Sequence, residues 1–546
     1  MNRLIFNQQV IRQKTGLDTE QALLLPRLDL ESKVASSPFM LEKDDGSCIL
    51  VAKDIECGNF HEEGLQAAVK YYRPYLTFDP IVDIVAEDWL ELVQENVEGN
   101  KLEVDECIYY AAFKELQAIF DVNVTQGASW RRVYLYEINP DDVSNQMMVS
   151  YEQCRADVNR VAPSLTGYLE NFKNNRFKLL DEMLAQLKLD ALLVSSPLNQ
   201  QEIAGLPLDF FTKSEAVTFY YHNKVYVLSS QPIFHSLPQL TGVFPDLRTG
   251  LKSLIGNDDG HISTGIEENH LPYGLFREVG LKEAGLRCIS TELRKWREVS
   301  AGEELPYYII AAQAARFGIE TAIQYAENAL NRGESILETD VEKQLYIAYQ
   351  KFVEESELSI SIRPYHTVLH SGSRSRRPNP PQFAPINADT RTMKIDAGLL
   401  AIDKNGLVRA VSDLARTLVR DENSRELYRF IENQMVNVAI PAAIPGKTGE
   451  EIYCIGTMEL IANQNRWVEI GVLPEGIDLT KGYNRDIGHV LGKQEPVTLT
   501  FRQGNKVVLK NGMVCCMEYH WPYYPYGIGI EDMFAVTSQG VVNITR

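Results

Sequence analysis

Two aspartates lie in neighbouring strand-like segments of the C-terminal half of the chain. Asp396 belongs to RTMKIDAGLLAI and Asp413 to RAVSDLARTLV, with Asn405–Gly406 between them. An Asn-Gly pair between apolar runs predicts a tight β-hairpin, and a loop centred on it places Asp396 opposite Ala415. Asp413 then shares a face of the hairpin with Asp396, roughly 7–8 Å away between Cα atoms, so both carboxylates can reach one divalent cation.

A second acidic pair follows near the C-terminal end. Glu518 lies in the apolar run VCCME and Glu531 in IGIEDMFAV. An ionised carboxylate in such surroundings is costly unless a cation or a metal compensates it. His489, in the Gly-flanked segment DIGHVLG, adds an imidazole. One imidazole and four carboxylates suit two divalent metal ions (manganese, iron, cobalt or zinc), which activate water for hydrolysis.

Taken singly, each of these residues is more often structural than metal-binding, so the prediction depends on their order. KIDAG, SDLART, GHVLG, the Met-Glu of CCMEY and IGIEDMFAVT resemble segments of the pita-bread metallopeptidases: aminopeptidase P, prolidase, methionine aminopeptidase and creatinase. The resemblance implies that Asp396 binds one metal through both oxygens, while His489 and Glu518 hold the other. Asp413 and Glu531 would bridge the two metals.

Residues that handle the peptide in those enzymes are missing here. The family usually has a histidine upstream of the first aspartate, where this chain reads SGSRSRRPNPPQF, and another where it has Arg485. The chain also reads GKQEPV in place of a third histidine, Tyr519 in place of a proline and Gly529 in place of an arginine. Because such histidines bind the scissile carbonyl and move protons, their loss predicts weak activity on ordinary Xaa-Pro peptides.

Other residues could reshape the pocket. His366 and His370 lie in RPYHTVLHSG, which in the resembling enzymes leads into the substrate pocket. A basic cluster (Arg374, Arg376, Arg377) and the aromatic segment HWPYYPYG follow. Two interpretations stay open: a solvated basic loop with packing aromatics, or a pocket for an anionic or aromatic small molecule.

Three functions fit this set of residues. A dinuclear metallohydrolase would cleave a C–N bond of a peptide or amide in a small molecule or short peptide, with Glu518 as general base. A metal-dependent lyase would act on a carboxylate-bearing small molecule, with His366 or His370 as the base. A non-catalytic binding protein is the least favoured, because the fold alone does not require the five ligand residues.

The surrounding segments predict a multidomain chain of α/β and α+β class. Its 546 residues are too many for one core, at about 150 residues per domain. We predict an extra N-terminal α/β domain of unknown role over residues 1–165 and a creatinase-type N-terminal α/β domain over 166–300. A C-terminal pita-bread domain (the creatinase/aminopeptidase fold) follows over 301–546, and the resemblance covers about 168–546.

Helix patterns recur in the last domain. The order helix, Gly-containing turn, acidic helix start, helix occurs over 303–356 and returns over 424–464, which indicates an internal pseudo-repeat. Nearer the N-terminus, apolar residues at spacings of three and four predict helices over 62–76 and 105–120. His222–Asn223, between two strand patterns, predicts a hairpin turn.

Bulk composition narrows the partners and the compartment. The net charge of −20 disfavours nucleic acid as a partner. No apolar run approaches the roughly 20 residues that span a bilayer, and the first residues lack the apolar core of a signal peptide. The eight cysteines are scattered, without metal or redox spacing. We therefore expect a cytoplasmic protein with no membrane partner, and, by analogy with the resembling enzymes, a homodimer.

Overall fold

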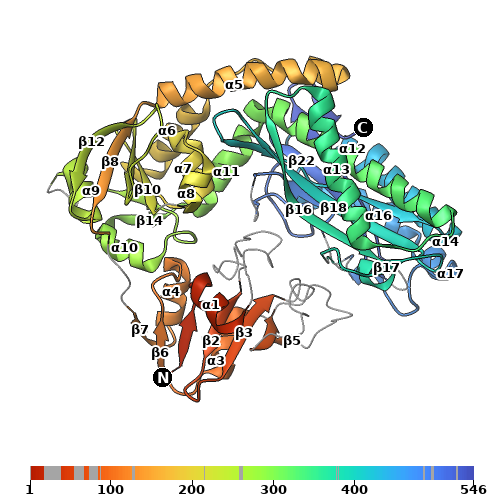
Figure 1. Cartoon of the computed structure of the whole chain (residues 1–546), viewed down its shortest axis with the longest axis horizontal. Helices are drawn as coiled ribbons and strands as arrows, with labels where there is room; N and C mark the ends of the chain where they lie inside the picture. The colour runs from red at the N-terminus through yellow and green to blue at the C-terminus, as the bar shows by residue number, and fades with distance from the viewer. Residues whose placement is uncertain are drawn as a thin grey trace. The chain divides into compact units, whose positions relative to one another are not determined.

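The structure is a computed structural model that divides into two compact units (Figure 1). Unit 1 comprises Met1–Met148, Asn174–Trp296 and Asn405–Leu407, and unit 2 comprises Val149–Lys173, Arg297–Lys404 and Val408–Arg546. The structure describes residues 2–16, 38–53, 67–72, 84–86, 88–125, 130–213, 215–256, 262–376, 378, 380–481, 483, 486–493, 497–523 and 527–546. All seven residues predicted as ligands or bases belong to unit 2.

The first sheet of unit 1 has the strand order β5-β4-β3-β2-β1-β6-β7. Its strands are β1 (Arg3–Ile5), β2 (Phe39–Glu42), β3 (Cys48–Lys53), β4 (Ala68–Tyr72), β5 (Ile84–Ala86), β6 (Lys101–Val104) and β7 (Asp121–Val124). The helices of this region are α1 (Gln8–Thr15), α3 (Trp89–Asn96) and α4 (Tyr110–Gln117). The predicted helix over 105–120 is confirmed by α4.

The helix predicted over 62–76 is wrong in the part that the structure describes. Ala68–Tyr72 forms strand β4, which pairs in parallel with β3 and places Lys70 beside Val51. Over so short a run, apolar spacing also fits a half-buried strand, and the neighbouring strand decides between the two.

The second sheet of unit 1 has the order β12-β8-β11-β10-β9-β13-β14. Its strands are β8 (Val133–Ile138), β9 (Ala191–Val194), β10 (Ala216–Tyr221), β11 (Lys224–Ser229), β12 (Gln239–Phe244), β13 (Thr264–Ile266) and β14 (Leu286–Cys288). Its helices are α6 (Arg176–Leu187), α7 (Pro197–Ala204), α8 (Leu208–Lys213), α9 (Leu247–Ile255) and α10 (Tyr273–Val279), with η3 (Glu283–Gly285). The predicted turn at His222–Asn223 is confirmed, since both residues have positive φ between β10 and β11. β8 lies within the residues assigned to the extra domain yet pairs with β11 and β12; the three-domain division stays a prediction.

Unit 2 contains two four-stranded sheets that carry the predicted ligands. One has the order β16-β18-β19, with β20 also paired to β18, and the other the order β21-β22-β23-β24. The strands are β16 (Ser361–Ser371), β18 (Thr392–Ile402), β19 (Val408–Val411), β20 (Leu414–Val419), β21 (Gly488–Val490), β22 (Val514–Trp521), β23 (Ile528–Thr537) and β24 (Gly540–Asn543). A two-stranded sheet pairs β15 (Ile336–Leu337) with β17 (Pro385–Ile386).

The helices of unit 2 follow the predicted pseudo-repeat. They are α12 (Leu305–Asn331), α13 (Glu338–Ser356), α14 (Glu422–Gln434), α15 (Ile440–Ala442), α16 (Gly449–Ala462) and α17 (Gln464–Glu469), with the short η2 (Pro163–Tyr168), η4 (Ala301–Glu304), η5 (Gly372–Arg376), η6 (Met435–Ala439) and η7 (Leu479–Lys481). Helices α5 (Pro140–Val161) and α11 (Ser290–Ser300) each contain residues of both units. The second helix of each repeat starts alike: Asp340 accepts the N–H of Leu337, and Glu451 that of Thr448, each at 2.9 Å. None of the described helices combines the length and apolar character that a membrane span needs.

Strand β18 separates the core of unit 2 from the site. Ile395, Ala397 and Leu399 are fully buried and pack in one cluster with an alanine-rich face of α12. Figure 1 shows α12 and α13 beside this sheet. Because side chains alternate along a strand, Asp396 lies on the opposite face, toward the second sheet.

A buried ion network stabilises the base of the hairpin. Arg409 on β19 places Nε 3.0 Å from Oε1 of Glu304 and Nη1 3.3 Å from Oδ2 of Asp403. Lys493 donates to the same Glu304 oxygen at 2.5 Å. All four side chains are at most 1% exposed, so each charge depends on its partners for compensation.

Arg409→Met should destabilise the protein by about 3–5 kcal/mol, because it leaves the carboxylate of Asp403 buried without its cation. Urea unfolding followed by circular dichroism measures the change in unfolding free energy. Arg332→Met is the matched control, since Arg332 pairs with Glu334 at the surface, and it should leave the midpoint unchanged. Equal midpoints for the Arg409 variant and the parent would contradict the assigned role.

Candidate metal centre

The aspartate hairpin forms with the predicted register. β18 pairs antiparallel with β20 and places Asp396 opposite Ala415. A register shift between Ala401 and Ile402 lies close to the turn and leaves this pairing unchanged. The carboxylate of Asp413, just before β20, therefore points to the same side as that of Asp396.

The glutamate pair and the histidine lie on the second sheet. Glu518 on β22 is directly opposite Glu531 on β23, and His489 on β21 is opposite Cys516. Period-two alternation places Cys516 and Glu518 on the same face of β22. All four side chains are buried.

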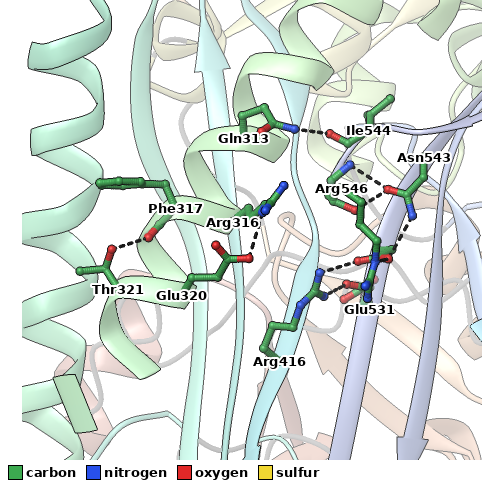
Figure 2. A network of polar contacts seen from close by, with 12 residues as sticks. Gln313, Arg316, Phe317, Glu320, Thr321, Arg416, Glu531, Asn543, Ile544 and Arg546 are labelled. Carbon is green, nitrogen blue, oxygen red and sulfur yellow. Dashed lines mark hydrogen bonds and ion pairs between the residues drawn. The ribbon is translucent and has the colours of Figure 1, made fainter. Parts of the chain in front are cut away.

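Contacts between β20 and β23 bring the two sheets together. Arg416 donates to the backbone oxygen of Glu531 at 2.5 Å and to Oδ1 of Asp532 at 2.6 Å, and Figure 2 shows its guanidinium reaching Glu531. Thr417 donates to the backbone oxygen of Gly529 at 2.7 Å and accepts from the Gly529 N–H at 2.9 Å. These bonds fix the aspartate hairpin beside the glutamate strands.

Two groups of side chains have potential ligand atoms within 4.8 Å of one another. One is Asp413, His489, Cys516 and Glu531, and the other is His366, Asp396 and Asp413. Asp413 belongs to both groups. Among the described residues, neither group includes Glu518.

His366 is the sequence candidate that the structure places inside the centre. Its Nε2 lies 3.2 Å from Oδ1 of Asp396 and 3.3 Å from Oδ1 of Asp413. Burial alone lowers the pKa of His366, but the carboxylates of Asp413 and Asp396 outweigh burial and raise that pKa to about 10. His370 is fully buried opposite Lys394, but neither ligand group of the described residues contains it.

Lys394 was not predicted as part of the site. Its side chain is 1% exposed, with Nζ 3.0 Å from Oδ2 of Asp396 and 4.0 Å from Oε1 of Glu518. Burial alone lowers the pKa of Lys394, but these two carboxylates outweigh burial and raise it. Conversely, burial raises the pKa of Asp396, but Lys394 and His366 outweigh burial and hold that pKa well below its usual range. Because side chains alternate along KIDAG, Lys394 and Asp396 share one face of the strand, which is the signal that could have indicated the lysine.

Glu531 is the group whose environment most requires a cation. Burial, followed by the charges of Asp413 and Glu518, raises the pKa of Glu531 well above its usual value. Its Oε1 is buried and accepts no hydrogen bond from the described part of the chain. Carboxylates, an imidazole and the thiol of Cys516 around this oxygen suit a borderline divalent metal, so the residues fit one. That the five predicted residues are metal ligands stays a prediction.

Arg374 and Arg376 of the basic cluster contact other parts of the protein. Arg374 pairs with the buried Glu338 and donates to the backbone oxygen of Pro380 at 3.0 Å. Arg376 donates to the backbone oxygen of Pro522 at 3.1 Å. Arg377 and Arg485, residues 494–496 of GKQEPV and residues 524–526 of the aromatic segment lie outside the described residues.

Comparisons with known proteins agree with the resemblance. Residues 310–538 match the model of metallopeptidase family M24, and no curated protein matches the chain. The fold is similar to an X-prolyl aminopeptidase from Caenorhabditis elegans, described as a cytosolic enzyme with a di-nuclear active site (TM-score 0.56, 12% identity, 93% of this chain and 81% of that chain). It is also similar to a prolidase from Pyrococcus horikoshii (TM-score 0.51, 22% identity, 68% and 98%) and to the N-terminal domain of FACT complex subunit SPT16 from chickpea (TM-score 0.50, 12% identity, 72% and 96%).

These findings define a mixed α/β multidomain protein with a pita-bread domain in its C-terminal region. Within that domain, residues 310–538 match metallopeptidase family M24, in line with the resemblance carried by the five segments. The similar structures include two peptidases and a domain of a multi-subunit complex, so the activity must be argued from the site and not from the fold.

In metal-free protein, His366 should stabilise the fold most at low pH. Its folded-state pKa of about 10 exceeds the unfolded value of roughly 6.5, so the stabilisation is complete below about pH 6.5 and is lost as the pH rises through 10. Urea unfolding in chelator, with the parent and His366→Gln compared between about pH 6 and 10, measures this difference. The gap should narrow with rising pH, whereas His222→Asn, in an exposed turn, should show no such trend. A gap independent of pH would contradict the ion contacts of His366.

Proposed function

We propose that this protein is a metal-dependent hydrolase that cleaves a C–N bond, peptide or amide, in a small molecule or short peptide. The observation that carries the proposal is the buried Oε1 of Glu531, which accepts no hydrogen bond from the described residues and belongs to one group with Asp413, His489 and Cys516. The family match and the peptidases of similar fold support hydrolysis as the chemistry. The proposal requires at least one divalent cation; two cations, from manganese, iron, cobalt and zinc, are what the resemblance predicts.

The chain's own residues would divide the work. Asp413, His489 and Glu531 would hold a cation, which polarises a carbonyl and makes water more acidic when bound. Glu518 faces this group from β22 without belonging to it, so its carboxylate can accept a proton from water. Lys394, 4.0 Å from Glu518, balances part of the negative charge beside that base.

A metal-dependent lyase acting on a carboxylate-bearing small molecule is the second candidate. It is favoured by the placement of His366 at 3.2 Å from Asp396, within the centre. The family match and the peptidases of similar fold favour hydrolysis over this second candidate.

Protein supplied with Mn²⁺ or Zn²⁺ should bind the metal and hydrolyse short amides, with weak turnover of simple Xaa-Pro dipeptides. Asp413→Ala should lose bound metal and at least ~100-fold in turnover, because Asp413 belongs to both ligand groups. Elemental analysis and a substrate screen measure both effects, with the exposed Asp389→Ala as control. Protein that takes up no metal would refute the proposal, and robust Xaa-Pro turnover would show that the missing histidines matter little.

Glu518→Gln should retain the fold and bound metal yet lose roughly 10²-fold in turnover, the scale expected when a general base is lost. Turnover must be normalised to the metal content of each preparation. Glu459→Gln, on the exposed side of α16, is the matched control and should behave like the parent. Unchanged turnover in metal-loaded Glu518→Gln would exclude Glu518 as the base and favour the lyase with His366 or His370.

A further inference from the structure

One side chain of the centre is itself a cation. Lys394 on β18 shares the site face with Asp396, and its Nζ lies 3.0 Å from Oδ2 of that residue. The same Nζ lies 4.0 Å from Oε1 of Glu518 on the other sheet. The ammonium group therefore lies between a carboxylate implied to bind one metal and a carboxylate implied to bind the other.

The space that the lysine occupies depends on Gly529 of β23. A Cβ atom at Gly529 would lie 2.5 Å from Cε, 2.9 Å from Cδ and 3.0 Å from Nζ of Lys394. The backbone of Gly529 is not in the left-handed region, so no turn requires glycine here. What requires it is the close passage of the lysine across the strand.

Asp396 has both oxygens engaged by basic side chains. Lys394 contacts Oδ2, and Nε2 of His366 lies 3.2 Å from Oδ1. A metal bound through both oxygens would have to replace both contacts and would lie close to a like charge. Basic side chains of the protein thus already contact both oxygens at the metal position implied for Asp396.

The other position remains suited to a metal. The ion pairs of Lys394 are with Asp396 and Glu518, and neither belongs to the group of Asp413, His489, Cys516 and Glu531. Oε1 of Glu531 in that group accepts no hydrogen bond from the described residues. One divalent cation plus the ammonium group would leave the four carboxylates of the centre with one negative charge, beside the imidazole of His366. Two divalent cations plus the ammonium group would leave a buried positive charge, which desolvation disfavours.

We propose that the ammonium group of Lys394 takes the place of one metal ion, so that the centre binds a single divalent cation between Asp413, His489, Cys516 and Glu531. This inference rests on the proposed metal dependence and adds the number of ions. It departs from the two ions that the resemblance implies.

The test is the number of Mn²⁺ ions bound per chain of full-length protein. Chelator-treated protein is titrated with Mn²⁺, freed of excess metal and analysed for manganese, and the electron paramagnetic resonance spectrum reports whether two ions interact. The parent should bind one ion, and Lys394→Met, which keeps the length but removes the charge, should bind two interacting ions. Lys493→Met is the matched control: it removes another buried lysine, paired with Glu304 at 2.5 Å, and should bind one ion.

Gly529→Ala provides a second variant that keeps the lysine. Its Cβ would displace the Lys394 side chain, so it should also admit a second ion even if Lys394→Met does not fold. Two ions in the parent would overturn this inference and leave the proposed hydrolase intact. One ion in both site variants would also overturn it, whereas no ion in any of the proteins would overturn the proposed function itself.

Discussion

Four carboxylates within one centre, two of them buried and two half-buried, are the constraint on which this domain depends. Asp396, Asp413, Glu518 and Glu531 approach one another from two sheets, and burial makes each negative charge expensive unless a cation is near. The protein supplies part of the compensation itself. Lys394 and His366 contact the aspartates, while Glu531 has an oxygen with no hydrogen bond from the described residues. The uncompensated negative charge of the centre thus lies around Glu531, which identifies where an external cation fits.

Such a centre needs a rigid joint between its halves. Arg416 and Thr417 of β20 connect the two sheets by donating hydrogen bonds to the backbone oxygens of Glu531 and Gly529 on β23. Asp532 accepts a hydrogen bond from Arg416 at 2.6 Å and also forms an ion pair with Arg546, so Arg546 belongs to the same network (Figure 2). Because these bonds are made mostly to backbone, the positions of the ligand side chains follow from strand geometry. Small shifts of either sheet would move carboxylates together or apart.

The register of the aspartate hairpin could be predicted because it follows from local rules. The turn at Asn405–Gly406 and the two-residue period place Asp396 opposite Ala415, and the structure has that pairing. Strand β4, by contrast, was mistaken for a helix because its neighbour β3 decides its conformation. Local rules also could not predict which of His366 and His370 contacts the aspartates. His366 lies opposite Gly398, where a Cβ atom would come within 2.5 Å of its ring, whereas His370 lies opposite Lys394.

Lys394 and Gly529 show why the remaining part of the site was not visible in either segment alone. The resembling enzymes usually carry an arginine where this chain has Gly529, which by itself suggests a lost positive charge. The structure shows that a positive charge is present, delivered from β18 by Lys394 through the space that glycine leaves. The lysine, however, directly contacts Asp396, one of the predicted ligand residues. The positive charge thus comes from β18 instead of β23. This change alters what the carboxylates can bind, although all five ligand residue types are retained.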